Sequence, residues 1–130
     1  MADRVAKVYG MEVVPAAVEN AKRNAQFKWT WKYTLWGWNC WKNHPKWLSE
    51  GIKPDVIFVD PPRKGLDEGF IKAAAMMNPR RIVYISCNPA TFARDVVRFE
   101  ADGYLLDKVQ PVDLFPQTHH IELVASFNKK

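Results

Sequence analysis

Two short and almost entirely apolar runs constrain the fold of this chain more than any other feature of its sequence. They are residues 55–59 (DVIFV) and 81–86 (RIVYIS). Runs of this kind are typical of strands that are buried on both faces of a parallel sheet. Each run is followed by polar residues and then by a segment with helical signals, at residues 67–77 and about 88–102. Strands that alternate with helices in this way predict an open α/β sheet.

The segments on either side extend this pattern. Residues 6–13 predict a further buried strand, and Pro15 then opens a helix, since the missing N–H of proline has no partner in a first helical turn. The tail predicts two strands, about 104–110 and 120–127, joined by the loop 111–119. The chain should therefore end in a hairpin that forms an antiparallel edge of the sheet.

Capping residues mark the ends of the two later helices. Asn88 is suited to cap the second of them, with Pro89 at its first position and Gly103 after its end. The first should stop before Asn78, because the residue that precedes a proline disfavours helical geometry.

Composition limits the class of protein. The chain has 130 residues, 48% of them apolar and 13% aromatic, which predicts one ordered domain with a real core. It has no apolar run of membrane-spanning length, and its start, MADRVAK, lacks a signal-peptide stretch. Two cysteines, Cys40 and Cys87, are too few for a disulfide framework or a four-thiolate metal site. We therefore expect a reducing, cytoplasmic setting.

Residues 27–47 do not fit the pattern. They contain all six tryptophans and follow neither a period of 2 nor one of 3.6. Four lysines without an acid give this segment +4 of the net charge of +5, so the rest of the chain is only +1. One interpretation is a basic, aromatic surface on which single-stranded bases stack. The alternatives are a poorly packed insertion and a sequence error.

Three polar residues stand where predicted strands end, which is where ligands of open α/β sheets bind. They are Glu12, Asp60 and Cys87. An acid in the position of Glu12 is suited to accept hydrogen bonds from ribose hydroxyls. The alternative is that it is solvated or caps the next helix.

Asp60 begins the sequence Asp-Pro-Pro-Arg. The two prolines stiffen the loop and leave backbone carbonyls free, so a planar ligand could approach a fixed backbone. Arg63, which ends this sequence, can pair with a phosphate. The alternative is a rigid turn between a strand and a helix.

Cys87 lies between a predicted strand and the start of a helix. Free N–H groups and the positive end of the helix dipole favour a thiolate there, so Cys87 is a candidate nucleophile. The alternative is a small, buried apolar residue, as many free cysteines are.

His119, His120 and Glu122 could suggest a metal. Adjacent residues of a strand point to opposite faces, however, so the two histidines should not share an ion, and two ligands on one face make a poor site. We therefore expect no metal. Glu122 is interpreted as a carboxylate that points into the same crevice as Cys87, or else as a surface residue of the strand.

Three segments resemble one enzyme family. Residues 59–67 (VDPPRKGLD), 84–95 (YISCNPATFARD) and 111–122 (PVDLFPQTHHIE) are similar to the RNA (uracil-5-)-methyltransferases that use S-adenosylmethionine. The resemblance covers residues 4–26 and about 48–127. It implies a Rossmann-like methyltransferase fold, and the form of residues 111–122 looks more like the 23S ribosomal RNA branch than the tRNA branch.

The resemblance also implies a role for each candidate residue. Cys87 matches the nucleophile that adds to C6 of uracil, and Glu122 matches the base that removes the C5 proton. Glu12 matches the acid on the cofactor ribose, and Asp60 a residue at the cofactor and the target base. Apart from the resemblance, Arg63 is expected to bind the RNA substrate, because it can pair with a phosphate.

The chain departs from the family in two places. It contains no Gly-rich loop upstream of Glu12, no RNA-binding domain and no iron–sulfur cysteines, so we expect residues 1–130 to be the C-terminal part of a catalytic domain. Residues 27–47 suggest a reading-frame error, since a one-base shift turns the single tryptophan codon into a glycine codon. An inactive remnant, a tRNA enzyme and a module that binds single-stranded nucleic acid remain alternatives.

Overall fold

The structure is a computed structural model that describes residues 5–28, 33–36 and 49–130, which fall into two units, 1–46 and 47–130. In the first unit, strand β1 (Val8–Met11) is followed by helix α1 (Pro15–Lys28) and strand β2 (Tyr33–Trp36). The two strands pair in parallel, with Val8 opposite Tyr33. Pro15 is the first residue of α1, which confirms the predicted start of this helix.

Strand β2 lies inside the tryptophan-rich segment, where the sequence predicted no regular structure. The strand is defined by its backbone pairing with β1. The remainder of that segment from residue 29 to residue 47 lies outside the described residues.

The second unit is an α/β sheet with an antiparallel edge, as the sequence predicted. Its strands have the order β3-β4-β6-β5, in which β3 and β4 are parallel and β6 is antiparallel to both of its neighbours. In chain order the elements are β3 (Val56–Val59), α3 (Glu68–Met76), β4 (Arg81–Ser86), α4 (Pro89–Ala101), β5 (Tyr104–Val112) and β6 (Glu122–Lys129).

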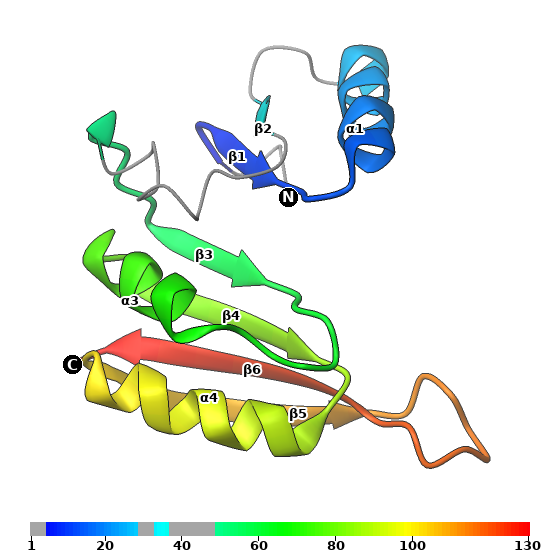
Figure 1. The fold of residues 1–130 in the computed structure, drawn as a ribbon, viewed down its shortest axis with the longest axis vertical. Helices are drawn as coiled ribbons and strands as arrows, with labels where there is room; N and C mark the ends of the chain where they lie inside the picture. Colours follow the sequence, from blue (N-terminus) through cyan, green and yellow to red (C-terminus); the bar gives the residue numbers. More distant parts are fainter. Residues whose placement is uncertain (1–4, 29–32, 37–48) are drawn as a thin grey trace. The chain divides into compact units, whose positions relative to one another are not determined.

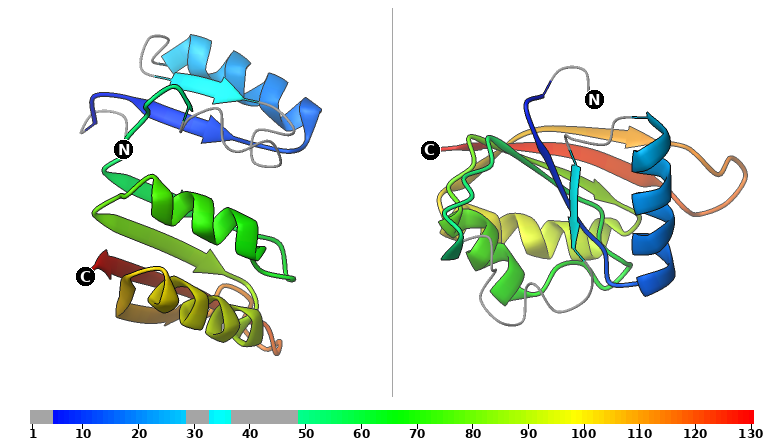
Figure 2. Two further views of the ribbon diagram at one scale, coloured as in Figure 1. Left: turned by 60° about the vertical axis from the view of Figure 1, so that its left-hand side comes forward. Right: turned by 90° about the horizontal axis from the view of Figure 1, so that it is seen from above.

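Helices α3 and α4 lie on the same face of this sheet, as Figures 1 and 2 show. The core lies between the helices and that face. Tyr84 of β4 and Phe92 of α4 meet edge to face at 5.3 Å between ring centres, and Phe99 and Phe127 lie 5.0 Å apart. The buried core residues of the unit are Val59, Ile71, Ile82, Tyr84, Phe92, Phe99, Tyr104, Leu123, Ala125 and Phe127.

The predicted helix ends are confirmed. The side chain of Asn88 accepts a hydrogen bond from the N–H of Ala90 at the start of α4, and Gly103 follows the helix with φ of +91°. Asp67 caps α3 in the same way through the N–H of Phe70. Asn78 ends that helix with a positive φ of 59°.

The predicted hairpin is present, but its boundaries differ. β5 runs on through Pro111 to Val112, because it is the edge strand of the sheet and proline is tolerated there. β6 begins at Glu122 rather than at residue 120. His119 and His120 therefore belong to the loop, not to the strand.

The topology brings the ends of three strands to one edge of the sheet. The carboxyl ends of β3 and β4 lie at the same edge because the two strands are parallel, and the antiparallel β6 begins there. Ser86, the last residue of β4, is opposite Leu123 of β6. One further step along this register brings Cys87 next to Glu122.

In the described part of the chain, no helix is both long and apolar enough to cross a membrane.

Candidate active site

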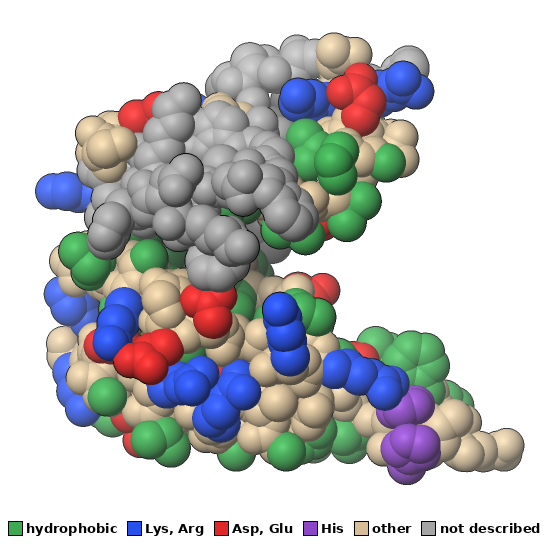
Figure 3. Space-filling view, in the orientation of Figure 1, with side chains coloured by type: hydrophobic (Ala, Val, Ile, Leu, Met, Phe, Trp, Pro, Cys, Tyr) green, Lys and Arg blue, Asp and Glu red, His purple; other side chains and the backbone are tan. Residues whose placement is uncertain are grey.

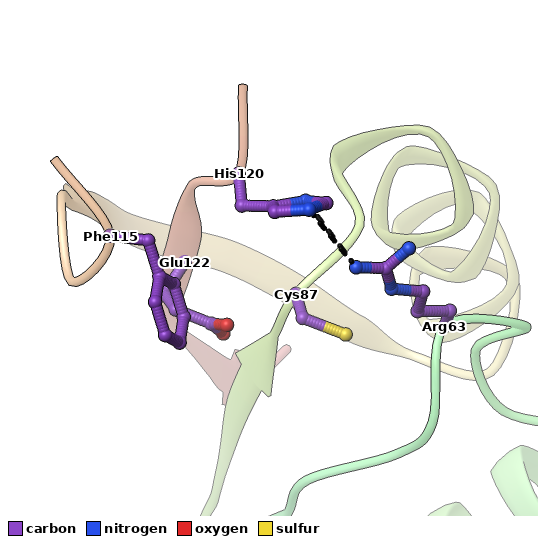
Figure 4. A pocket seen from close by; sticks show the side chains of 5 residues that line it. All are labelled: Arg63, Cys87, Phe115, His120 and Glu122. Atoms are coloured by element: carbon purple, nitrogen blue, oxygen red, sulfur yellow. Dashed lines mark hydrogen bonds between the residues drawn. The ribbon is translucent and has the colours of Figure 1, made fainter. Parts of the chain in front are cut away.

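A pocket of about 240 Å³ opens at this edge of the sheet, and its lining contains three of the predicted site residues. They are Arg63 from the loop after β3, Cys87 from the end of β4, and Glu122 from the start of β6 (Figure 4). Phe115 and His120, both from the loop between β5 and β6, complete the lining. The volume is below the range of about 300–1,000 Å³ for drug-sized ligands, so the pocket suits a single small ring.

Cys87 is held by the residues on either side of it. The hydroxyl of Ser86 donates to the carbonyl of Asn88 at 3.1 Å and accepts the N–H of Asn88 at 3.2 Å. Asn88 in turn caps α4. The thiol is free and half-buried, and it lies at the N-terminus of this helix, as the sequence predicted.

The loop between β5 and β6 carries the far wall of the pocket. Its turn is closed by Thr118, whose N–H and hydroxyl both donate to the carbonyl of Phe115, at 3.2 and 2.7 Å. The same hydroxyl accepts the N–H of His120 at 3.2 Å. Thr118 therefore fixes both pocket residues of the loop relative to each other.

Sequence reasoning missed Phe115. It stands in a polar loop without any periodicity, and its only signal was that a large aromatic residue is flanked there by Leu114 and a proline. In the structure its side chain is 51% exposed although it lines the pocket. The ring therefore offers a face for a flat ligand.

Arg63 and His120 approach each other across the mouth of the pocket. One terminal guanidinium nitrogen of Arg63 lies 3.4 Å from each ring nitrogen of His120. The two histidines are at the surface, beside basic side chains (Figure 3). Two basic groups in contact form a place where an anion can be bound.

The two histidines interact, contrary to the expectation that they point apart. Because they lie in the loop and not in β6, strand alternation does not separate them, and their rings are 4.1 Å apart. The charge of His119 lowers the pKa of His120. Desolvation and Arg63 act in the same direction, whereas Glu122 opposes them.

Two predicted site residues do not line this pocket. Asp60 follows β3 directly and is exposed. Glu12 belongs to the first unit, where one carboxylate oxygen accepts the N–H groups of Val13 and Val14, at 2.6 and 2.9 Å. Both of these N–H groups lie between Glu12 and the first residue of α1, Pro15.

Among the residues that the structure describes, no group of three or more histidine, cysteine or acidic side chains is arranged to hold a metal ion.

One protein-family model matches residues 50–130 and is described as tRNA (uracil-5-)-methyltransferase. The matched range contains all five residues that line the pocket. Glu12 and the whole of the tryptophan-rich segment precede it.

Similar proteins cover the whole chain. It is 87% identical over 130 residues to the uncharacterized RNA methyltransferase YljE of Lactococcus lactis, and 56% identical over 124 residues to an uncharacterized RNA methyltransferase of Streptococcus mutans. These matches cover 100% and 95% of this chain. The chain spans 28% of the length of both relatives.

Two methyltransferases of known structure are similar to this chain. The tRNA (uracil-54, C5)-methyltransferase of Pyrococcus abyssi, in complex with S-adenosyl-L-homocysteine, is 34% identical with a TM-score of 0.75 and covers 93% of this chain and 28% of its own. The precorrin-6y C5,15-methyltransferase of Geobacter metallireducens, 17% identical with a TM-score of 0.70, shares the fold alone and covers 95% of this chain and 67% of its own. The fold is the Rossmann-like fold of S-adenosylmethionine-dependent methyltransferases.

Proposed function

The chain belongs to the tRNA (uracil-5-)-methyltransferase family, and from this membership we propose that it supplies the catalytic pocket for S-adenosylmethionine-dependent methylation of C5 of uracil in RNA. The observation that supports this most directly is that the thiol of Cys87 and the carboxylate of Glu122 line one pocket. Because the chain spans 28% of its relatives, the activity of the whole enzyme is part of the proposal.

The proposed reaction begins at Cys87. C5 of uracil is too weak a nucleophile to take a methyl group unaided. The thiolate of Cys87 forms a bond to C6, and the electrons of the C5–C6 double bond move to O4 as an enolate, which makes C5 nucleophilic. Covalent catalysis of this kind divides one difficult step into easier ones. The cofactor supplies the electrophilic methyl group that C5 takes up.

Glu122 completes the cycle. Its carboxylate takes the proton from C5, the electrons of that C–H bond re-form the C5–C6 double bond, and the bond between C6 and the sulfur breaks. Cys87 leaves as a thiolate, ready for another turnover. Cys87 directly follows β4 and Glu122 begins the neighbouring β6, so the pairing of these two strands places the two groups side by side.

The other pocket residues are proposed to hold the RNA. The exposed ring of Phe115 provides a stacking surface for the uracil, and Arg63 with His120 binds a phosphate beside it. A target base must leave its stack to reach the thiol, at a cost of a few kcal/mol. Stacking on Phe115 offsets part of that cost.

S-adenosylmethionine is the cofactor of this family, and the residues of this chain fit it. The carboxylate of Glu12 has about four acceptor positions, so the two backbone N–H groups it binds leave capacity for ribose hydroxyls. Glu12 follows β1, and Asp60 follows β3. We propose that these two acids bind the cofactor, and that Asp60 also contacts the target base.

For the RNA, we propose 23S ribosomal RNA, because residues 111–122 are most similar to that branch of the family. A tRNA is the second candidate, since the Pyrococcus abyssi relative acts on uracil-54 of tRNA. The reaction requires Cys87 as a free thiol, so a reducing, cytoplasmic setting is part of the proposal.

Two rival functions remain distinguishable. An inactive remnant would show no saturable binding of S-adenosylmethionine, which a titration measures. A module that binds single strands through the tryptophan-rich segment would lose most of that affinity when Trp29, Trp31 and Trp36 are replaced by alanine. Sequencing the DNA that encodes residues 27–47 tests the reading-frame hypothesis.

The function is tested with a hybrid enzyme, in which this chain replaces the matching 28% of the Lactococcus lactis relative. The hybrid, the relative itself and this chain are incubated with S-adenosylmethionine and either 23S ribosomal RNA or tRNA, and the digested nucleosides are analysed by mass. We expect 5-methyluridine from the hybrid with 23S ribosomal RNA. Methylation of another nucleoside by the hybrid would refute the proposal.

A further inference from the structure

The loop that carries Arg63 is held by the side chains of one helix, α4. In the loop of residues 63–66, the carbonyls of three residues and the N–H of one are hydrogen-bonded to side chains. All of these side chains belong to the cap of α4 or to the turns that follow it. The bonds join Asn88 Nδ2 and Thr91 Oγ1 to the carbonyl of Arg63 at 3.1 Å each, Arg94 to the carbonyls of Lys64 and Leu66 at 2.9 and 3.1 Å, and Asp95 to the N–H of Leu66 at 2.8 Å.

Asp95 is the centre of this arrangement. It is fully buried, and one carboxylate oxygen accepts both the N–H of Leu66 and the hydroxyl of Tyr84, each at 2.8 Å. The other oxygen pairs with the Arg94 guanidinium at 2.8 Å, and Arg98 lies 3.4 Å from it. A buried carboxylate is tolerated only with such partners, so its orientation is strongly constrained.

Gly65 shows how closely the loop approaches this carboxylate. Its φ is +75°, and a Cβ added there would lie 2.6 Å from both the Oδ2 atom of Asp95 and the Arg94 guanidinium. Any side chain at this position would push the loop away from α4. Glycine suits this position for two reasons. It adopts a positive φ readily, and its lack of a side chain lets the loop contact Asp95 directly.

Helix α4 also begins next to the reactive group. Cys87 immediately precedes its cap, Asn88, so the helix that fixes the Arg63 loop is continuous with the turn that fixes the thiol. Arg63 itself reaches the pocket from that loop (Figure 4). The backbone of Arg63 and the turn that carries the thiol are thus both held by α4.

We propose that Asp95 is a positioning residue that holds the loop of residues 62–67 on α4, so that Arg63 points into the pocket and binds the RNA. This rests on the proposed function, in which Arg63 binds an RNA phosphate. Asp95 touches neither the target base nor the cofactor in this account. Its effect on RNA binding passes through Arg63.

The test is Asp95→Asn in the hybrid enzyme. The amide keeps the size of the side chain but places an NH₂ donor against either the Arg94 guanidinium or the N–H of Leu66, so either the ion pair with Arg94 or the bond to Leu66 is lost and the loop is held less tightly. We expect the KM for RNA to rise about tenfold with kcat nearly unchanged, since small misplacements of a binding group are costly. The rate of Cys87 alkylation by iodoacetamide should stay within about twofold of the wild-type rate.

A double-mutant cycle with Arg63→Ala separates positioning from general damage. If Asp95 acts through Arg63, then Asp95→Asn adds little to the KM of a protein that already carries Arg63→Ala. Full additivity of the two effects would overturn the proposal. Tyr84→Phe is the matched control, because it removes one partner of the same carboxylate but leaves the bonds to the loop, and its KM should be close to that of the wild type.

The remaining outcomes also distinguish the positioning role of Asp95 from the RNA-binding role of Arg63. If Arg63→Ala raises the KM but Asp95→Asn does not, the positioning role is wrong while the proposed function stands. If Arg63→Ala itself leaves the KM unchanged, the proposal falls together with the RNA-binding role of Arg63. Should Asp95→Asn fail to fold, Thr91→Ala, which removes one bond to the Arg63 carbonyl, must raise the KM by a smaller factor in the same cycle, and an unchanged KM refutes the proposal.

Discussion

Glu122 has the most specific role among the residues of the pocket, because its proposed task comes after the methyl group has been transferred. Replacing it by glutamine preserves its size but removes the base that takes the C5 proton. We expect Glu122→Gln to leave the methylated uracil attached to Cys87, since elimination cannot proceed. A covalent complex with ordinary uridine RNA should then persist through denaturing electrophoresis.

The matched control for this variant is Glu100→Gln in α4, an exposed acid that does not line the pocket. It should turn over without trapping RNA. Rapid turnover by Glu122→Gln, with no trapped complex, would show that another group removes the proton.

The pKa of His120 depends on the charged groups at the opening of the pocket. Its pKa lies below the usual value mainly because of the nearby charge of His119. Because its pKa is lowered, His120 takes up a proton only at a lower pH than an isolated histidine does. Replacing His119 by glutamine removes this repulsion, so the pKa of His120 should rise, which an NMR titration of the ring protons measures. An unchanged or lower pKa would contradict the observed contact between the rings.

At the scale of single elements, the cap residue of α4 allows an effect on stability to be distinguished from an effect on the reaction at Cys87. Asn88→Ala removes the side-chain acceptor at the helix start and the bond to the Arg63 carbonyl. Loss of a cap costs about 1 kcal/mol of unfolding free energy. Asp67→Ala removes the corresponding cap of α3 at a similar cost.

The two variants should therefore melt at similarly lowered temperatures, but only Asn88→Ala should slow the covalent reaction at Cys87. Calorimetry measures the first quantity, and the rate of adduct formation with 5-fluorouridine RNA measures the second. Equal effects of both variants on that rate would mean that the loss of stability alone explains the change.

Elements with a strong local signal were predictable. The apolar runs of β3 and β4 and the Asn-Pro start of α4 appear where the sequence places them, because burial and capping are encoded locally. The start of β6 was set two residues too early, since Ile121 and His120 continue the alternation that begins at Glu122. Strand β2 could not be predicted, because only its pairing with β1 defines it.

The site was predictable only in part, for a related reason. Arg63 and Cys87 come after the ends of β3 and β4, and Glu122 begins β6 at the same edge, so the parallel and antiparallel order of the sheet brings them into one pocket. Phe115 and His120 enter it through hydrogen bonds of Thr118 inside a loop, which no periodicity reveals. Asp60 belongs to the same edge, yet it lies outside the lining.

For the molecule as a whole, cofactor binding tests whether both units contribute to one function. We expect Glu12→Ala in the hybrid enzyme to weaken S-adenosylmethionine binding by about 10–100-fold, the loss expected for hydrogen bonds to a charged group. Isothermal titration measures this affinity. Glu19→Ala is the matched control, because this acid of α1 pairs with Arg23 one turn away in a solvent-exposed contact.

An unchanged affinity in Glu12→Ala would mean that its carboxylate serves only the N–H groups of Val13 and Val14. Weaker binding in Glu19→Ala as well would point to a general effect of charge on the first unit.

The central claim is that Cys87 attacks C6 of uracil, and the mass of the intact protein tests it most directly. The hybrid enzyme is incubated with S-adenosylmethionine and RNA that contains 5-fluorouridine, whose C5 fluorine cannot leave as a proton does, so the adduct should be trapped. We expect a mass increase equal to the methylated RNA fragment, located at Cys87 by peptide mapping and absent from Cys87→Ala. An adduct that survives in Cys87→Ala, or one located at another residue, would contradict the account.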